Sequence, residues 1–366
     1  MTRTRGGGQA MPRRRPTLRD IAARAGVSVA TASLVLRNSP LVAARTRARV
    51  QEAAQALGYV YDRAAAALRT GRTHTVGLAI NDLANPYFAR LTAAIEQALD
   101  RLGWTVFLCD TRETPEVLVR FGERLREYGA EGLIVCPPEG TTPATIATAT
   151  AGTLPCVQVS REVRGARADM AGSDHRRGTA LAVSHLIALG HRRIALVGAG
   201  RRTSTGAARR AGYLAALRRA GIAADPALMI PGPDTREHGA AAVHALLRHP
   251  DPPSAVMAFN DTVAFGVMLG LRQIGLDPGI DLAVVGCDDV DEAALWTPPL
   301  TTIAIDAPGM GQAAVELFLA RLADPHAPPR RVMLMPRLVV RLSCGVGVGG
   351  PRAIRAGALT MRAAPR

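Results

Sequence analysis

The chain of 366 residues contains no lysine, so all 45 of its basic side chains are arginines. These arginines are unevenly placed. Residues 1–72 hold 14 arginines against three acidic residues, a net charge of +11, whereas residues 73–343 hold 27 charges of each sign. The last 23 residues hold four arginines and no acid. A basic N-terminal region before a neutral body is typical of proteins that bind the phosphate groups of nucleic acid. A basic tail can also serve only to keep a protein soluble.

Other absences exclude whole classes of protein. No CxxC pair is present among the scattered cysteines, and the eight histidines show no metal-ligand spacing. We therefore expect reduced, mostly buried thiols and neither a disulfide framework nor a metal or cofactor. The first residues lack the apolar segment of a signal peptide, and no apolar run approaches the ~20 residues of a membrane helix. These features predict a cytoplasmic, nucleoid-associated protein. The five cysteines are Cys109, Cys136, Cys156, Cys287 and Cys344.

Residues 17–38, TLRDIAARAGVSVATASLVLRN, predict two short helices joined by a tight turn. Thr17 is a candidate N-cap, and Asp20 completes an acidic variant of the capping box. Gly26 permits the turn, and Ser28 can cap the second helix. Such a helix pair can place its second helix in the major groove of DNA. A small alanine-rich bundle without a ligand is the alternative.

Helical spacing divides the side chains of this segment into two faces. In the second helix, Ala32, Val35 and Leu36 are expected to face inward. Residues 42–57 predict a third helix that ends at Gly58. The inward residues of the first and third helices are expected to be Leu18, Ile21, Ala22, Ala25, Val50, Ala53, Ala54 and Leu57, and the outward residues of the second helix Val29, Ala30, Ser33 and Leu34.

After residue 72 the chain alternates between short apolar runs and helical patterns, which predicts parallel sheets covered by helices. The pattern occurs in two sets, so we expect two lobes with a ligand cleft where their strand ends face each other. The expected strands are 76–80, 105–109, 132–136, 155–159, 193–197, 255–259 and 282–287. The expected helices are 87–102, 116–128, 178–189, 208–220, 237–247 and 262–274.

An ordered set of motifs gives the chain a resemblance to a known family. The motifs are TLRDIAARAGVSVATASLVL, LGYVYDRAAAALRTGRT, VGLAINDLANPYFARL, HLIALGHRRIALVG, RRAGYLAAL, AFNDTVAFGVM, VVGCDD and PPLTTI. Over about residues 16–344 the chain resembles transcription regulators of the lactose-repressor (LacI/GalR) family. The resemblance implies an all-α N-terminal helix-turn-helix head and an α/β periplasmic-binding-protein-like body of two Rossmann-like parallel-sheet lobes.

The resemblance also implies a domain plan, with the helix-turn-helix domain at 16–60, the hinge helix or linker at 61–72 and the body at 73–344. The composition of residues 1–15 and 345–366, which are rich in Gly, Pro and Arg or irregular, predicts a disordered basic tail at each end. Within the body, lobe 1 covers about 73–172 and 303–328, and lobe 2 covers about 173–302 and 329–344.

For the head, the resemblance implies a recognition helix that begins at Ser28. Val29 and Ala30 would read bases through apolar contacts, and Leu34 stands where many members carry an arginine. Leu68 matches the hinge residue that wedges into the minor groove, although an alanine-rich linker with one buried leucine is the alternative. The remaining DNA contacts implied are Thr17, Thr31, Ser33, Asn38 and Arg63.

For the body, the resemblance implies an effector pocket. Arg209 matches a ligand-gripping arginine and Asp288 a carboxylate that accepts from ligand hydroxyls. Without the resemblance, Arg209 reads as a helix-face charge, Asp288 as a loop cap and Phe88 as core. Ser160 stands where an aspartate that binds sugar is frequent, and Asp234 near a position where an aromatic ring often stacks. The pocket residues implied are Phe88, Arg161, Arg209, Asn260 and Asp288.

These observations predict a sequence-specific DNA-binding regulator, a repressor by the family's majority. A homodimer, with a tetramer left open, would bind a palindromic double-stranded operator under allosteric control by a small molecule, by default a carbohydrate. The alternative is a regulator or activator that responds to a purine or another metabolite. A transport protein would need a signal peptide. An enzyme is not expected, because Thr203 replaces the third glycine of the dinucleotide fingerprint that Gly198 begins.

Overall fold

The computed structural model describes residues 16–36, 39–59, 71–198 and 203–347. The remaining segments, which include the expected N-terminal tail, most of the expected hinge and residues 348–366 of the expected C-terminal tail, lie outside the described residues. Residues 345–347, expected to belong to that tail, are described, and Gly345 caps η2 (Leu342–Cys344). Contacts within the chain divide it into two compact units between Thr73 and His74, here called the head and the body. The division lies one residue beyond residue 72, the expected end of the linker. Each unit is described by itself.

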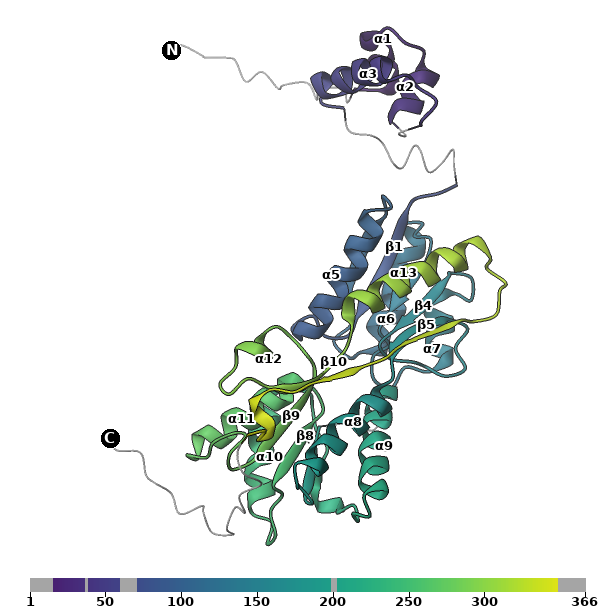
Figure 1. Ribbon diagram of the computed structural model, residues 1–366. Coiled ribbons are helices and arrows are strands. Elements are labelled where there is room, and N and C mark those ends of the chain that lie inside the picture. The colour runs from purple at the N-terminus through teal and green to yellow at the C-terminus, as the bar shows by residue number, and fades with distance from the viewer. Residues whose placement is uncertain (1–15, 37–38, 60–70, 199–202, 348–366) are drawn as a thin grey trace, which may run out of the picture. The chain divides into compact units, whose positions relative to one another are not determined.

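The head consists of three helices, α1 (Leu18–Ala25), α2 (Val29–Leu36) and α3 (Ala44–Leu57) (Figure 1). The predicted caps are confirmed. The Asp20 carboxylate accepts from the backbone nitrogen and the hydroxyl of Thr17, both at 2.7 Å. Gly26 ends α1 with a φ of 60°, and the Ser28 hydroxyl accepts from the backbone nitrogen of Thr31 at 3.0 Å. Short-range polar contacts therefore fix both ends of the turn.

The core of the head is formed by small side chains from all three helices. Ile21, Val35 and Val50 are at most 1% exposed, as the helical spacing predicts. Helix α3 begins at Ala44 rather than at Val42, because the backbone at Ala43 is still extended with a ψ of 144°. It ends at Gly58, which is left-handed as expected.

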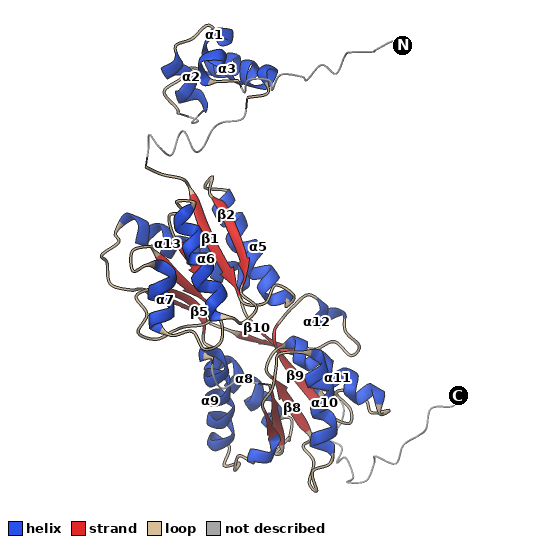
Figure 2. Ribbon diagram, turned by 180° about the vertical axis from the view of Figure 1, so that it is seen from behind, coloured by secondary structure: helices blue, strands red, loops and turns tan. Residues whose placement is uncertain are grey.

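The body contains two six-stranded sheets, each covered by helices on both faces (Figures 1 and 2). The first has the order β11-β5-β4-β3-β1-β2, and all of its pairings are parallel. Helices α5 (Pro86–Asp100) and α13 (Ala307–Ala323) pack together, as do α6 (Pro115–Glu127) and α7 (Pro143–Thr150). The strands are β1 (Thr75–Ile80), β2 (Thr105–Asp110), β3 (Leu133–Val135), β4 (Cys156–Val159), β5 (Asp169–Ser173) and β11 (Arg331–Leu334).

The second sheet has the order β12-β10-β9-β8-β6-β7, and only β12 is antiparallel to its neighbour. Helices α8 (His175–Ala188) and α9 (Ser204–Arg219) lie on one side of it, and α10 (Arg236–Leu247) and α11 (Asp261–Gln273) on the other (Figure 2). A short α12 (Glu292–Leu295) follows β9. The strands are β6 (Ile194–Val197), β7 (Met229–Ile230), β8 (Ala255–Ala258), β9 (Ala283–Asp288), β10 (Thr301–Ala304) and β12 (Arg337–Val339); the 3₁₀ helices are η1 (Pro226–Leu228) and η2 (Leu342–Cys344).

The predicted assignment of residues 329–344 to the second lobe is wrong for β11. Met170 pairs with Arg331 and Ser173 with Leu334, so β11 extends the first sheet beside β5. The chain then crosses to the second sheet, where Leu338 of β12 pairs with Ile303 of β10. Strand β11 alternates between exposed and half-buried residues, as an edge strand does. Its partner β5 lies about 160 positions earlier in the sequence, so the local pattern of β11 does not predict the pairing.

Candidate DNA-binding and effector sites

The outer face of α2 carries small and apolar side chains. Val29 is 43% exposed and Ala30 is also exposed, while Thr31, Ser33 and Leu34 are half-buried. The hydroxyls of Thr31 and Ser28 lie 2.9 Å apart, so they bond to each other at the start of the helix. This surface suits apolar contact with thymine methyl groups better than bidentate hydrogen bonding to bases. Thr17, at the start of α1, is half-buried and bonded to Asp20.

Arginines surround this helix pair and also tie the head together. Arg19, Arg24 and Arg45 are exposed. Arg47 donates to the carbonyl of Ser39, and Arg49 to the carbonyl of Ala25. Two arginines of α3 thus anchor backbone at either end of α2 while keeping a positive charge that can attract phosphates. Among the implied DNA contacts, Asn38, Arg63 and Leu68 lie outside the described residues.

In the body, the carboxyl ends of the parallel strands place the candidate effector residues. In each sheet the strand order reverses beside the first strand, and ligands of such sheets bind at the carboxyl ends near that point. Arg161 follows β4, Asn260 follows β8, and Asp288 ends β9. Arg90 of α5 donates to the carbonyl of Asp289 at 2.6 Å, which links the two lobes at this edge.

Arg209 is the centre of a buried cluster in the second lobe. It lies on α9 and is 5% exposed. One terminal nitrogen donates to the carbonyl of Phe259 at 2.6 Å, and the other lies 3.4 Å from the Asp288 carboxylate and 3.5 Å from Nδ1 of His175. Its guanidinium carbon also lies 4.2 Å from the centre of the Phe259 ring. Arg209 and Asp288, both expected in the effector pocket, therefore lie side by side, and Arg209 is not an exposed charge on a helix face.

Asp288 and Asp261 form an acidic pair beneath this arginine. Burial raises the pKa of both carboxyls. At Asp288, Arg209 opposes that rise and the Asp261 carboxyl adds to it, whereas at Asp261 the added rise comes from Asp289. Asp261 accepts from the Thr302 hydroxyl at 2.5 Å and from the backbone nitrogen of Val290 at 3.0 Å. Asp288 has an unusual φ of 128° at the strand end. A buried carboxyl has lost its hydrogen bonds to water, so a hydrogen bond donated by a ligand hydroxyl would stabilise it.

Arg161 supplies the second buried guanidinium, from the first lobe. It is 6% exposed and forms a salt bridge of 2.8 Å with Glu113, which in turn accepts from the amide of Asn81 at 2.7 Å. Asp234, after β7, interacts electrostatically with both Arg161 and Arg209. Burial raises the pKa of Asp234 to about 6, and the two arginines oppose that rise. Acidic and basic groups of both lobes thus converge.

Phe88 and Asn260 already have structural roles. Phe88 is 7% exposed and packs edge-on against Tyr87 with ring centres 5.0 Å apart, as the core alternative predicts. The side-chain oxygen of Asn260 caps α11 by accepting from the backbone nitrogen of Val263 at 2.9 Å. Only the amide donors of Asn260 remain to be assigned.

Three functional candidates escaped the sequence analysis. Glu113 holds Arg161, His175 touches Arg209, and Asp261 shares the acidic pair with Asp288. Glu113 and His175 lie in no motif with a recognisable spacing, whereas Asp261 follows Asn260 in the motif AFNDTVAFGVM, which gives the signal that could have identified it. Four of the five cysteines are buried, as expected.

Two further findings concern the parts of the chain that the structure describes. No group of three or more histidine, cysteine or acidic side chains there is placed to hold a metal ion. None of the helices found there has the length and apolar character needed to cross a membrane.

Comparisons with known proteins agree with this geometry. Residues 17–62 match bacterial regulatory proteins of the lacI family, and residues 183–344 match the periplasmic binding protein-like domain. The ribose operon repressor of Escherichia coli (strain K12) is 31% identical over 89% of this chain and 98% of its own. The repressor PurR of Haemophilus influenzae (strain PittEE) is 29% identical over 89% and 98%. The Lac repressor dimer bound to operator and the anti-inducer ONPF matches with a TM-score of 0.79 and 29% identity, over 90% of this chain and 99% of that one.

Proposed function

This chain belongs to the LacI family of bacterial DNA-binding transcription regulators, and we propose that it is a repressor that releases or binds its operator in response to a carbohydrate. One observation carries the proposal. A helix-turn-helix head and a two-lobe body with two buried arginines among carboxylates, Arg161 and Arg209, occur in one chain. The ligand would bias the arrangement of the lobes and thereby the DNA affinity of the heads. The proposal contains no catalytic step, and it places the protein in the cytoplasm with its DNA.

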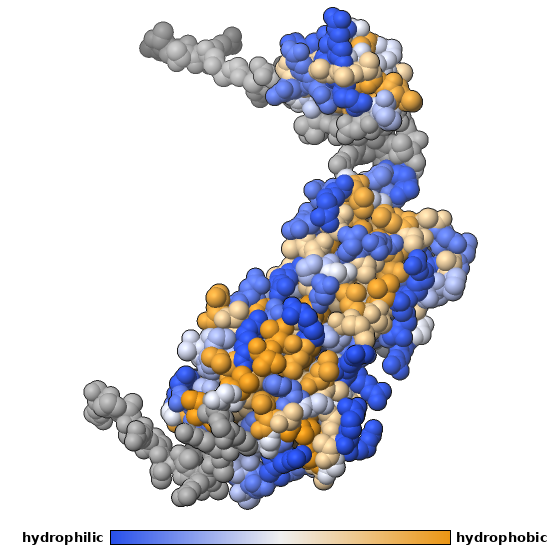
Figure 3. Space-filling model, in the orientation of Figure 1, coloured by the Kyte–Doolittle hydropathy of each residue, from blue (hydrophilic) through white to orange (hydrophobic). Residues whose placement is uncertain are grey.

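A homodimer is consistent with the features of both the head and the second lobe of the body. One recognition helix with few hydrogen-bonding side chains contacts too little DNA, so a palindrome read by two heads is expected. The second lobe offers an apolar surface for pairing. Leu295 of α12, Leu342 of η2 and Leu269 of α11 are 81%, 56% and 40% exposed, and apolar surface is visible in that lobe in Figure 3. The stacking of Phe265 on Trp296, 4.4 Å apart, joins α11 to α12 beneath this surface.

A carbohydrate is favoured over a purine by the polar groups of the body. Arg209 and Asp288 offer a paired donor and acceptor, which suit vicinal hydroxyls. A LacI-family regulator from Enterococcus faecium, 28% identical over 74% of this chain and 98% of its own with a TM-score of 0.66, was solved with bound ribose. A purine, the alternative that the family resemblance leaves open, remains the second candidate.

The test begins with the operator, because neither half of the proposal can be measured without it. The full-length protein is used to select sequences from random double-stranded DNA, and a palindrome should be enriched. Operator affinity is then measured with a panel of sugars and of nucleobases. Arg209→Ala should keep operator binding and lose the ligand effect, whereas the control Arg210→Ala, the half-buried neighbour on α9, should keep both. Retained ligand response in Arg209→Ala would remove Arg209 from the site.

The hinge gives a second test. Leu68, outside the described residues, is proposed to wedge into the minor groove and kink the operator. Leu68→Ala should weaken operator binding strongly and leave binding to random DNA nearly unchanged. Equal losses on the two DNAs, in the same gel-shift titration, would contradict this role.

A further inference from the structure

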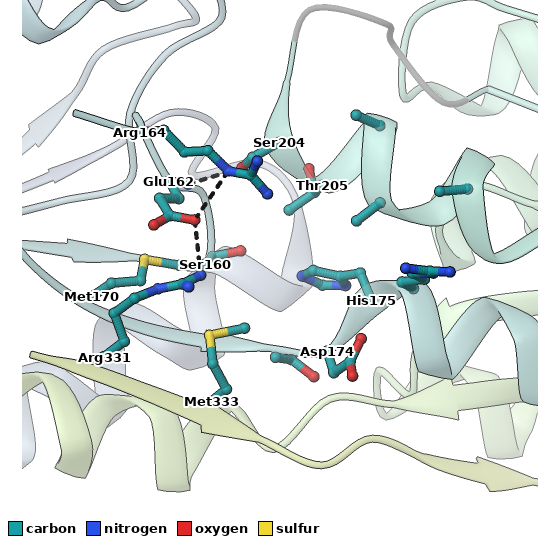
Figure 4. Close-up of a pocket in the computed structure, with 15 residues that line it drawn as sticks. Ser160, Glu162, Arg164, Met170, Asp174, His175, Ser204, Thr205, Arg331 and Met333 are labelled. Carbon is teal, nitrogen blue, oxygen red and sulfur yellow. Dashed lines mark hydrogen bonds and ion pairs between the residues drawn. The ribbon is translucent and has the colours of Figure 1, made fainter. Parts of the chain in front are cut away.

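A cavity of about 540 Å³ opens between the two lobes beside the Arg209 cluster (Figure 4). The first lobe contributes β5, β11 and the segment after β4, and the second contributes the N-terminal turns of α8 and α9. Among the candidate site residues described above, His175 lines this cavity, whereas Arg161, Arg209 and Asp288 do not. Its polar and charged lining residues are Ser160, Glu162, Arg164, Ser173, Asp174, His175, Arg176, Ser204, Thr205 and Arg331.

His175 connects the cavity to the Arg209 cluster and points to a ligand. The residue is 5% exposed and lines the cavity, and its ring is drawn among Ser160, Thr205 and Asp174 in Figure 4. Its Nδ1 lies 3.5 Å from a guanidinium nitrogen of Arg209, which can only donate, so Nδ1 accepts and the proton is on Nε2. Burial and the nearby arginines lower the pKa of His175 well below its usual value, which keeps the ring neutral. Among the described residues that Nε2 atom is buried without a partner.

Among the charged residues that line the cavity, hydrogen-bond donors outnumber acceptors. Three arginines, Arg164, Arg176 and Arg331, face two carboxylates. Glu162 accepts a hydrogen bond of 2.9 Å from one N–H group of Arg331 and forms an ion pair with Arg164 at 4.0 Å, too long for a hydrogen bond. The Asp174 carboxylate accepts from the backbone nitrogen of Arg177 at 2.9 Å as the cap of α8. The carboxylates are thus already bonded, while arginine and histidine donors remain.

We propose that this cavity binds the carboxylate or phosphate group of an acidic carbohydrate, whose hydroxyl groups occupy the adjoining Arg209–Asp288 cluster. The inference rests on the proposed function, since it refines the effector from a carbohydrate to an anionic one. An anion is the ligand group that accepts hydrogen bonds from every side, and arginine forks bind carboxylate and phosphate oxygens in pairs. A neutral sugar would leave the arginine donors of the cavity without such a partner.

The experiment compares matched probes on the full-length protein by calorimetry. The probes are D-ribose with D-ribose 5-phosphate, D-glucose with D-glucose 6-phosphate and D-glucuronate, and inorganic phosphate alone. At least one acidic sugar should bind about tenfold or more tightly than its neutral parent, the effect of one or two charge-assisted hydrogen bonds. The identity of the better acid distinguishes phosphate from carboxylate.

Variants locate the preference. The double variant Arg164→Gln, Arg331→Gln should bind the acidic sugar only as tightly as the corresponding neutral sugar. Its affinity for the neutral sugar should equal that of the unmodified protein. Both side chains are more than half exposed, so the fold does not depend on them. The control Arg218→Gln, an exposed position on α9 away from the cavity, should behave as the parent protein.

Three outcomes would overturn the inference: no advantage for acidic sugars, an advantage that survives the double substitution, or inorganic phosphate alone binding as tightly as the sugar phosphate. Neutral sugars that bind through Arg209 with no acidic advantage would refute this inference only. If no sugar of either kind binds, the proposed carbohydrate effector fails as well.

Discussion

The head and the body differ in how far apart in the sequence their interacting functional residues lie. In the head, the caps and the outward face lie within residues 17–34, and Thr17, Asp20 and Ser28 bond to residues three positions away. In the body, Arg161 meets Glu113 across 48 positions and Arg209 meets Asp288 across 79. The comparison teaches that a groove-facing helix is a local property, whereas a ligand site between sheets is a property of the topology.

The two units also treat arginine differently. Most arginines described in the head are exposed or half-exposed, as long-range attraction to phosphates requires. In the body Arg161, Arg209 and Arg321 are at most 9% exposed, and each has a carboxylate partner. Burial without such a partner would cost several kcal/mol. The same residue type thus serves attraction in one unit and architecture in the other.

The largest effect is expected where the body's architecture depends on one arginine. Arg321 of α13 forms two bonds of 2.9 Å with Asp169 of β5 and also donates to the carbonyls of Pro325, Ala327 and Pro328. Arg321→Ala leaves a buried carboxylate without its guanidinium, so the free energy of unfolding of the body should fall by about 3–5 kcal/mol.

Urea unfolding followed by tryptophan fluorescence measures this loss in the body alone, because both tryptophans, Trp104 and Trp296, lie there. The exposed Arg218→Ala serves as the control and should change little. If Arg321→Ala unfolds at the parent's urea concentration, the contrast between attracting and architectural arginines is lost for this residue.

A smaller, pH-dependent effect is expected at Asp288. Because burial raises the pKa of this carboxyl, the folded body binds more protons than the unfolded chain at pH values between the ordinary and the raised pKa. Its stabilising contribution is therefore present at low pH and is lost as pH rises through that range. Asp288→Asn removes the titration, so the stability of the variant relative to the parent should improve as pH rises.

The shift should exceed about 1.4 kcal/mol between pH 5 and pH 9, since each unit of raised pKa is worth that amount. Urea midpoints of both proteins across this range give the measurement. A stability difference that is constant with pH, or that moves in favour of the parent at high pH, would contradict the raised pKa.

The smallest effect is expected at the local cap of the head. Thr17→Ala removes a hydroxyl that lies 2.7 Å from Asp20 at the start of α1, and loss of such a cap typically costs about 1 kcal/mol. Hydrogen exchange of residues 18–25 in the full chain should accelerate accordingly, with tryptophan fluorescence of the body unchanged. Arg24→Ala, an exposed residue in the same helix, is the control. Faster exchange in the body as well would show that the two units are coupled.

Much of the fold could be read along the chain. The capped helix pair and the seven expected strands are all present, because apolar runs buried on both faces, such as the fully buried β6 and β9, have few other solutions. In the body, helices α7, α12 and α13 and strands β5, β7, β10, β11 and β12 were not predicted. Gly311 lets α13 pack on α5, since a Cβ there would lie 2.8 Å from that of Ala94, and no local pattern announces such a partner.

The candidate site divides in the same way. The resemblance assigns Arg209 and Asp288 to one pocket, and the structure brings them within 3.4 Å of each other. No sequence pattern near Arg161 identifies Glu113 as its partner, and none near Arg209 identifies His175. Those partners depend on which strand ends meet at one edge of a sheet.

The sequence by itself determined the composition of each unit: a basic head with a capped, apolar-faced recognition helix, and a neutral body of strand and helix repeats. Spacing and caps act over a few residues, so these are legible in order. Only the tertiary structure decided that β11 returns to the first sheet and that Arg164, His175 and Arg331 line one cavity. Strand pairing and the burial of charge join segments that the chain keeps far apart, and their free energy exists only once those segments meet.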